Sequence, residues 1–144
     1  YVLVTGALWG IIAAVFYWLP KWTGKMYNET LGKVHFWWSL ISVNVLFFPQ
    51  HFLGLAGMPR RIPDYALQFA DFNYISSIGA FSFGLSFLLF TYIVVDCIRN
   101  GKPADARPWP SAKGLEWTLS SPAAYHSFGE PPTRAEILAE SQHS

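Results

Sequence analysis

The sequence has 144 residues, of which 52% are hydrophobic, 18% aromatic and only 13% charged. This composition is too apolar for an ordinary soluble domain of this length, and it indicates a membrane protein. Ten basic residues are balanced by nine acidic residues, which argues against nucleic-acid binding because that function needs a concentrated basic face.

The first segment, residues 1–19, carries no charged side chain and is about long enough to cross a bilayer core, which takes roughly 20 helical residues. We expect this helix to end at Pro20. Gly6 and Gly10 form a small-xxx-small pair that would let another helix approach closely, although tight packing without a defined partner explains the pair equally well.

The loop of residues 20–33 carries three lysines, Lys21, Lys25 and Lys33, against the single acid Glu29. Short loops with an excess of lysine and arginine face the cytoplasm or the mitochondrial matrix. We therefore predict that this loop lies on the inner side of the membrane.

Residues 34–55 form the second predicted crossing. Asn44 and Gln50 interrupt its apolar run, and amides within hydrocarbon normally face another helix or a cofactor that meets their hydrogen bonds. His35 and His51 are residue types that bind metals, but they lie near opposite ends of the helix and cannot share one ion. We predict interfacial or hydrogen-bonded roles for both histidines.

The outer loop, residues 56–72, contains adjacent arginines, Arg60 and Arg61, directly after a Gly57-Met58-Pro59 turn. Arginine is always charged, and its planar guanidinium suits carboxylates and phosphates. A pair at a membrane edge therefore indicates a binding site for an anion. Snorkelling of both side chains to lipid headgroups is the alternative, and the sequence leaves the two about equal.

The third predicted crossing, residues 73–98, is rich in serine and glycine in its first half, which suits close packing against neighbouring helices. Asp96 lies at its inner end. This carboxylate could relay protons, but an interfacial position beside Arg99 is the simpler interpretation.

Residues 99–144 form a proline-rich tail that we expect on the inner side, with little capacity for a core of its own. Its apolar piece, residues 115–119, is expected to dock on a larger body. Residues 133–144 could form a short surface helix or be disordered.

Several strings of this sequence closely resemble the C-terminal part of subunit I of the heme-copper oxidases, in particular the cytochrome c oxidase type. They are YVLVTGALWGIIA, GKVHFW, NVLFFPQHFLGLAGMPRR, NYISSIGAF and LEWTLSSPAAYHSF, and the resemblance runs from Tyr1 to about Phe128. It implies an all-α membrane protein whose three transmembrane helices are the last three of a twelve-helix subunit, followed by an extended inner-side C-terminal tail.

In the family, one helix carries a His-Phe-His segment that ligates both hemes. The start of this chain resembles the continuation of that helix. The heme and copper ligands would therefore all lie upstream of Tyr1, and no catalytic residue or axial ligand is expected in this chain. We expect a C-terminal piece of a split or fragmentary subunit I that is active only in complex.

The resemblance also implies roles for particular residues. Arg60 and Arg61 match the arginines that bind heme propionates, and Pro63 and Asp64 match a position that helps to bind a calcium or sodium ion in some members. Residues that could flank the low-spin heme, or equally pack helices, are Leu3, Val4, Val43, Phe47 and Gln50.

The activity implied by the resemblance is that of a proton-pumping terminal oxidase, which reduces oxygen to water with electrons from cytochrome c. Its cofactors would be two hemes a and copper. Its partners would be the remainder of subunit I, the copper-bearing subunit II, subunit III and accessory subunits, in the mitochondrial inner membrane or, alternatively, a bacterial plasma membrane. A quinol-oxidizing relative and an accessory or assembly protein without cofactor contact are the alternatives.

Overall fold

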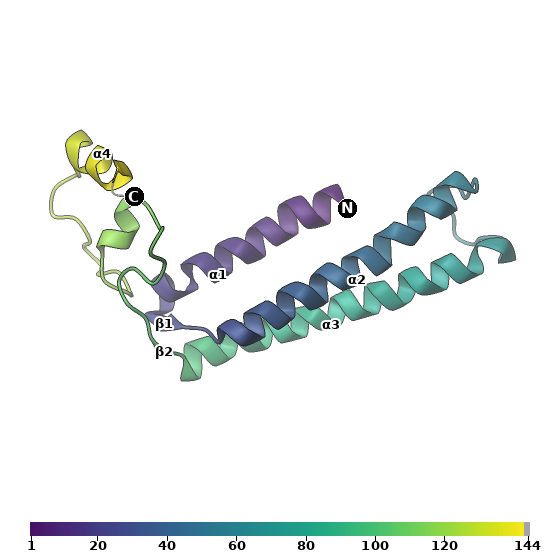
Figure 1. The fold of residues 1–144 in the computed structure, drawn as a ribbon, viewed down its shortest axis with the longest axis horizontal. Helices are drawn as coiled ribbons and strands as arrows, with labels where there is room; N and C mark the ends of the chain where they lie inside the picture. The colour runs from purple at the N-terminus through teal and green to yellow at the C-terminus, as the bar shows by residue number, and fades with distance from the viewer. Residues whose placement is uncertain (143–144) are drawn as a thin grey trace. The chain divides into compact units, whose positions relative to one another are not determined.

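The computed structural model describes residues 1–142, and most of them are helical (Figure 1). Three segments are long and apolar enough to cross a membrane, namely Val4–Thr23, Glu29–Leu55 and Leu67–Asn100. The predicted all-α class with three crossings is confirmed. In chain order the elements are a π-helix (Val4–Leu8), α1 (Trp9–Thr23), β1 (Lys25–Met26), α2 (Glu29–Leu55), a 3-10 turn (Leu67–Phe69), α3 (Ala70–Asn100), β2 (Lys102–Pro103), a second 3-10 turn (Leu115–Thr118) and α4 (Arg134–Gln142).

The prediction that the first helix ends at Pro20 is wrong, because α1 continues to Thr23 with Pro20 inside it. Proline lacks a backbone N–H but has a helical φ, so one hydrogen bond is lost and the next turn can still form. The Pro20 carbonyl accepts a hydrogen bond from the Gly24 N–H at 2.9 Å. Gly24 has a left-handed φ of 68°, and it ends the helix there.

The other two crossings also extend past their predicted apolar limits. Helix α2 begins at Glu29 rather than at residue 34, and α3 covers Ala70–Asn100 rather than residues 73–98. Hydrophobicity marks the part of a helix that lies in hydrocarbon, whereas backbone hydrogen bonding continues into polar residues at either end. Helix length was therefore underestimated from the sequence.

The described residues form two compact units. One contains Tyr1–Val4 and Glu29–Ile93, and the other contains Thr5–Asn28 and the described residues from Val94 onward. In the first unit, α2 and α3 lie side by side in opposite directions (Figure 1).

Close backbone approach and part-buried hydroxyl groups join α2 to α3. A Cβ added at Gly79 would lie 2.7 Å from Leu46 Cα, so glycine is required at this crossing. Nearby, the Trp38 indole N–H donates to Ser82 Oγ at 2.9 Å, and the hydroxyls of Ser42 and Ser82 are 2.8 Å apart. Small residues with interhelical hydrogen bonds are the usual way in which helices associate in membranes.

In the second unit, Lys21 holds the tail against the end of α1. Its side chain is buried, and its Nζ donates to the carbonyls of Ala106 and Leu119, both at 2.8 Å. The ammonium lies 5.1 Å from the ring centre of Trp117, which is itself 2% exposed and packs edge-on against Tyr17. The body on which the apolar tail piece docks is therefore α1 of the same chain.

Lys25 satisfies the C-terminal end of α3. Its Nζ donates to the carbonyls of Ile98 at 2.7 Å and Arg99 at 3.1 Å, which have no partner within the helix. Lys25 itself lies in β1, which pairs antiparallel with β2 and places Lys25 opposite Pro103.

A reciprocal cap begins α4. The Thr133 N–H and hydroxyl donate to Glu136 Oε2 at 2.7 and 2.9 Å, and these bonds hold the pKa of the Glu136 carboxyl below its ordinary value. This is the capping-box arrangement expected of a Thr-x-x-Glu sequence. Of the two alternatives for residues 133–144, a short helix is thus found over Arg134–Gln142, while His143 and Ser144 lie outside the described residues.

Gly79→Ala should weaken the pairing of α2 and α3, because its methyl group would overlap the α2 backbone. Overpacking of this kind costs about 1–3 kcal/mol, which should appear as a lower thermal-unfolding midpoint in detergent. Gly84→Ala on the same helix is the matched control, since nothing lies within 4 Å of a Cβ at that position. Equal midpoints for the two variants would contradict the close approach.

Lys21→Met should release the tail from α1. The methionine keeps the length and apolar stem of the side chain but leaves the part-buried carbonyl bonds without their donor, at a cost of up to about 1–3 kcal/mol for each unsatisfied group. We expect faster trypsin cleavage after Arg107 and Lys113. The control is Lys33→Met, which removes only an exposed ion pair with Glu29 (3.0 Å); an unchanged cleavage rate in Lys21→Met would refute the role of Lys21.

Candidate functional site

A hollow of about 480 Å³ lies where α2 ends and the chain turns into the loop of residues 56–72. The turn follows from Gly57, whose φ of 88° is readily adopted only by glycine. The Met58 N–H donates to the Leu53 carbonyl at 3.0 Å, so the chain folds back over the last turn of α2. The residues that line the hollow are Gln50, Leu53, Gly54, Met58, Pro59, Arg60, Arg61 and Ile62.

The end of α2 and the turn after it also contact the start of α3. The Asn73 amide donates to the Phe69 carbonyl at 2.9 Å and to Met58 Sδ at 3.4 Å. Phe52 and Phe72 stack with ring centres 5.6 Å apart. These contacts fix the turn from which the arginines project.

Arg60 and Arg61 are both exposed and both line the hollow. Within residues 1–142, neither side chain forms a salt bridge or hydrogen bond with another part of the chain. Guanidinium groups are strong donors to carboxylate and phosphate oxygens. Two of them at one hollow without an internal acid form a site suited to an anionic ligand.

The backbone of Arg61 is strained. Its φ of 58° places a residue with a Cβ in the left-handed region, at a cost of about 1–2 kcal/mol. Such conformations persist where the surrounding structure imposes them, and they concentrate at functional sites. The strain therefore marks the Arg61 backbone as a candidate functional position.

The predicted heme-facing residues of α2 differ in their surroundings. Gln50 is exposed and shares the hollow with the arginines, whereas Phe47 is half-buried with its ring centre 5.6 Å from that of Tyr1. Val43 has no exposed surface, so it has none to offer to a further group. The structure thus brings only Gln50 of these three residues to the arginine pair.

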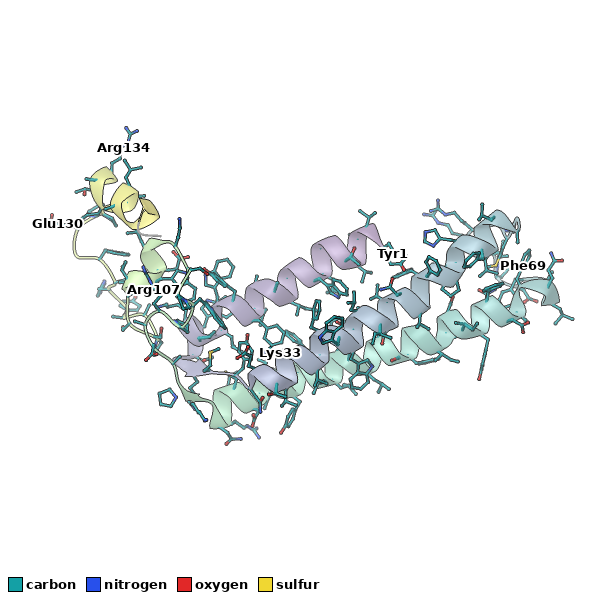
Figure 2. The ribbon with its side chains drawn as sticks, in the orientation of Figure 1. Tyr1, Lys33, Phe69, Arg107, Glu130 and Arg134 are labelled. Carbon is teal, nitrogen blue, oxygen red and sulfur yellow. The ribbon has the colours of Figure 1, made fainter. Side chains whose placement is uncertain are left out.

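Leu3 and Val4 belong to the same compact unit as α2, and Leu3 is exposed whereas Val4 is half-buried. Figure 2 shows Tyr1, at the start of this segment, beside α2. Its hydroxyl donates to Asn44 Oδ1 at 2.7 Å, and its ring lies 5.6 Å from the His51 ring. The polar partner predicted for Asn44 is therefore a tyrosine of this chain.

The predicted cation-site residues, Pro63 and Asp64, are both exposed. One oxygen of Asp64 accepts the Tyr65 N–H at 2.8 Å. In the part of the chain that the structure describes, no three His, Cys, Asp or Glu side chains come together to bind a metal. Asp64 alone therefore gives too few ligands, and a bound cation would need further ligands from elsewhere.

The residues that sequence reasoning did not assign to the hollow are Leu53, Gly54, Met58, Pro59 and Ile62. Their positions directly before and after the Gly57 turn were a usable signal, since a helix end that folds back encloses the residues on both sides. The Tyr1–Asn44 hydrogen bond left no such signal, because nothing in the two local sequences relates them.

These observations define a helical membrane protein with an arginine-lined hollow at the end of its second crossing. Residues 1–82 match the family model described as cytochrome c and quinol oxidase polypeptide I, and the chain belongs to this family.

Two relatives show how much of such a protein the chain represents. It is 43% identical to cytochrome c oxidase subunit 1 of Cereibacter sphaeroides over 94% of this chain, and 41% identical to that of Yarrowia lipolytica over 91%. These matches cover 24% and 28% of the relatives, so the chain spans about a quarter of their length.

Proposed function

We propose that this chain forms part of the catalytic subunit of a proton-pumping terminal oxidase that reduces oxygen to water with electrons from cytochrome c. Its own contribution is a clamp in which Arg60 and Arg61 bind heme propionates. The observation that carries the proposal is the pair of arginines, without partners among the described residues, at one hollow of about 480 Å³. Family membership supports the wider assignment.

The donors at the hollow fit propionate groups. A propionate is a carboxylate, and a guanidinium can donate two parallel N–H bonds to it. Adjacent positive charges also favour the ionised form of a carboxylate at the low-dielectric edge of a membrane. Arg60 and Arg61 would thus hold the propionates in place and keep them charged.

Heme a and copper would supply the electron-transfer and oxygen-binding chemistry when bound, with their ligands outside this chain. The residues of this chain would orient and enclose the low-spin heme. Gln50, Phe47, Leu3 and Val4 offer surface for such a wall, and the buried Val43 would support it from behind. Pro63 and Asp64 would contribute part of a calcium or sodium site.

The function requires partners. We propose the remainder of subunit I, subunits II and III and accessory subunits, with cytochrome c reached through subunit II. The three crossings place the chain in a membrane, proposed to be the mitochondrial inner membrane or a bacterial plasma membrane.

Quinol oxidation is the second candidate, because the description of the family covers quinol oxidases as well. Both of the relatives named above are cytochrome c oxidases, and this favours cytochrome c as the electron donor.

Arg60→Lys and Arg61→Lys test the clamp, since lysine keeps the charge but loses the bidentate geometry. Charge-assisted hydrogen bonds contribute about 1.5–3 kcal/mol each, so we expect oxygen consumption to fall about tenfold or more. The reduced-minus-oxidised spectrum of the purified complex should show shifted or weakened heme bands.

Arg99→Gln is the matched control, because Arg99 lies at the far end of α3, the end that is capped by Lys25. It should leave both readouts unchanged. Normal heme spectra and normal turnover in an Arg60→Gln/Arg61→Gln double variant would refute the clamp.

A further inference from the structure

The tail contains a second hollow, of about 520 Å³, in the unit that includes α4. One wall comes from the 3-10 turn Leu115–Thr118, and the other comes from α4 and the loop before it, which carries Glu130 (Figure 2). We call this hollow the tail groove. Its apolar lining includes Leu115, Phe128, Pro132 and Ala139, and its charged lining is Glu130 and Glu136.

Lipid does not account for the apolar surface at the tail groove. Every lining residue lies after Asn100, beyond the three segments that are able to span a membrane. Phe128 is nevertheless 45% exposed, Ile137 of α4 is 48% exposed and Tyr125 is 96% exposed. Exposed large apolar and aromatic side chains outside the spanning segments, with Phe128 in the groove itself, indicate contact with another protein.

The walls of the tail groove are held in place. Trp117, within the 3-10 turn, is buried and packs on Tyr17 and Lys21. On the opposite wall, the cap formed by Thr133 and Glu136 fixes the first turn of α4. These contacts order each wall internally, which reduces the entropy that each wall loses when a partner binds.

The charged residues that line the tail groove indicate the kind of partner that it can bind. Among the described residues that line it, two are carboxylates and none is lysine or arginine. Glu136 receives both Thr133 hydrogen bonds on Oε2, so its Oε1 can accept a hydrogen bond from a partner. Carboxylates repel the anionic headgroups of a membrane surface and attract a cationic side chain.

We propose that the tail groove binds a segment of another subunit in which a lysine or arginine lies beside apolar residues. The basic side chain pairs with Glu130 and Glu136, and the apolar residues pack on Phe128 and Leu115. This inference rests on the proposed function only in requiring that the chain works within a complex.

The test is photo-cross-linking in the complete complex, purified in mild detergent. Phe128→p-benzoylphenylalanine places the probe in the tail groove, and mass spectrometry identifies the attached peptide. We expect a single partner polypeptide whose cross-linked segment contains a lysine or arginine among apolar residues.

The charge requirement is tested in the same preparation with Glu130→Gln/Glu136→Gln. Glutamine also serves in a capping box, so α4 should persist while both charges are lost. The cross-link yield should fall by about threefold or more, as expected for two partly exposed charge contacts. Glu29→Gln, on α2, should leave the yield unchanged.

In a preparation with a normal heme spectrum, three results would overturn the tail-groove proposal. The first is a cross-link only to lipid or to a second copy of this chain. The others are a cross-linked partner segment without a basic residue and an unchanged cross-link yield in the double variant. The heme spectrum keeps the two proposals separate. The expected cross-link in a preparation without heme bands would support the tail groove while refuting the terminal-oxidase assignment.

Discussion

The carbonyl and amide groups at helix ends are the constraint on which this structure depends, because hydrocarbon offers them no partner. Each of the three crossings satisfies carbonyl groups at its C-terminal end with a different donor. The Gly24 amide closes α1, the Met58 amide folds back onto the Leu53 carbonyl at the end of α2, and Lys25 satisfies the last carbonyls of α3. The direction in which the chain leaves each helix follows from these bonds.

Four of the ten basic residues consequently fall into two groups. Lys21 and Lys25 donate hydrogen bonds to backbone carbonyls of their own chain. Arg60 and Arg61 follow a turn that is already satisfied by backbone bonds, so within the described residues their guanidinium groups remain available to a ligand. The same contrast separates the structural basic residues from those proposed to bind the cofactor.

The sequence was sufficient for features that depend on composition and local spacing. The three crossings follow from the apolar segments, and the arginine pair stands out because charge is scarce around it. The positions of the helix ends were harder to predict from the sequence. Pro20 lies inside α1 because a proline near a helix end costs only one hydrogen bond. The burial of Val43 and the enclosure of the tail groove depend on contacts between distant segments, for which a single sequence contains no signal.

The bond from Lys21 to the Leu119 carbonyl joins residues 98 positions apart. During synthesis the N-terminal residue of this pair is made first, and the ribosome must add α2, α3 and half of the tail before the acceptor exists. Until then the Lys21 ammonium depends on water or other groups for its hydrogen bonds, because its acceptors in the tail are not yet made. This contact can therefore close only after all three crossings have been synthesised.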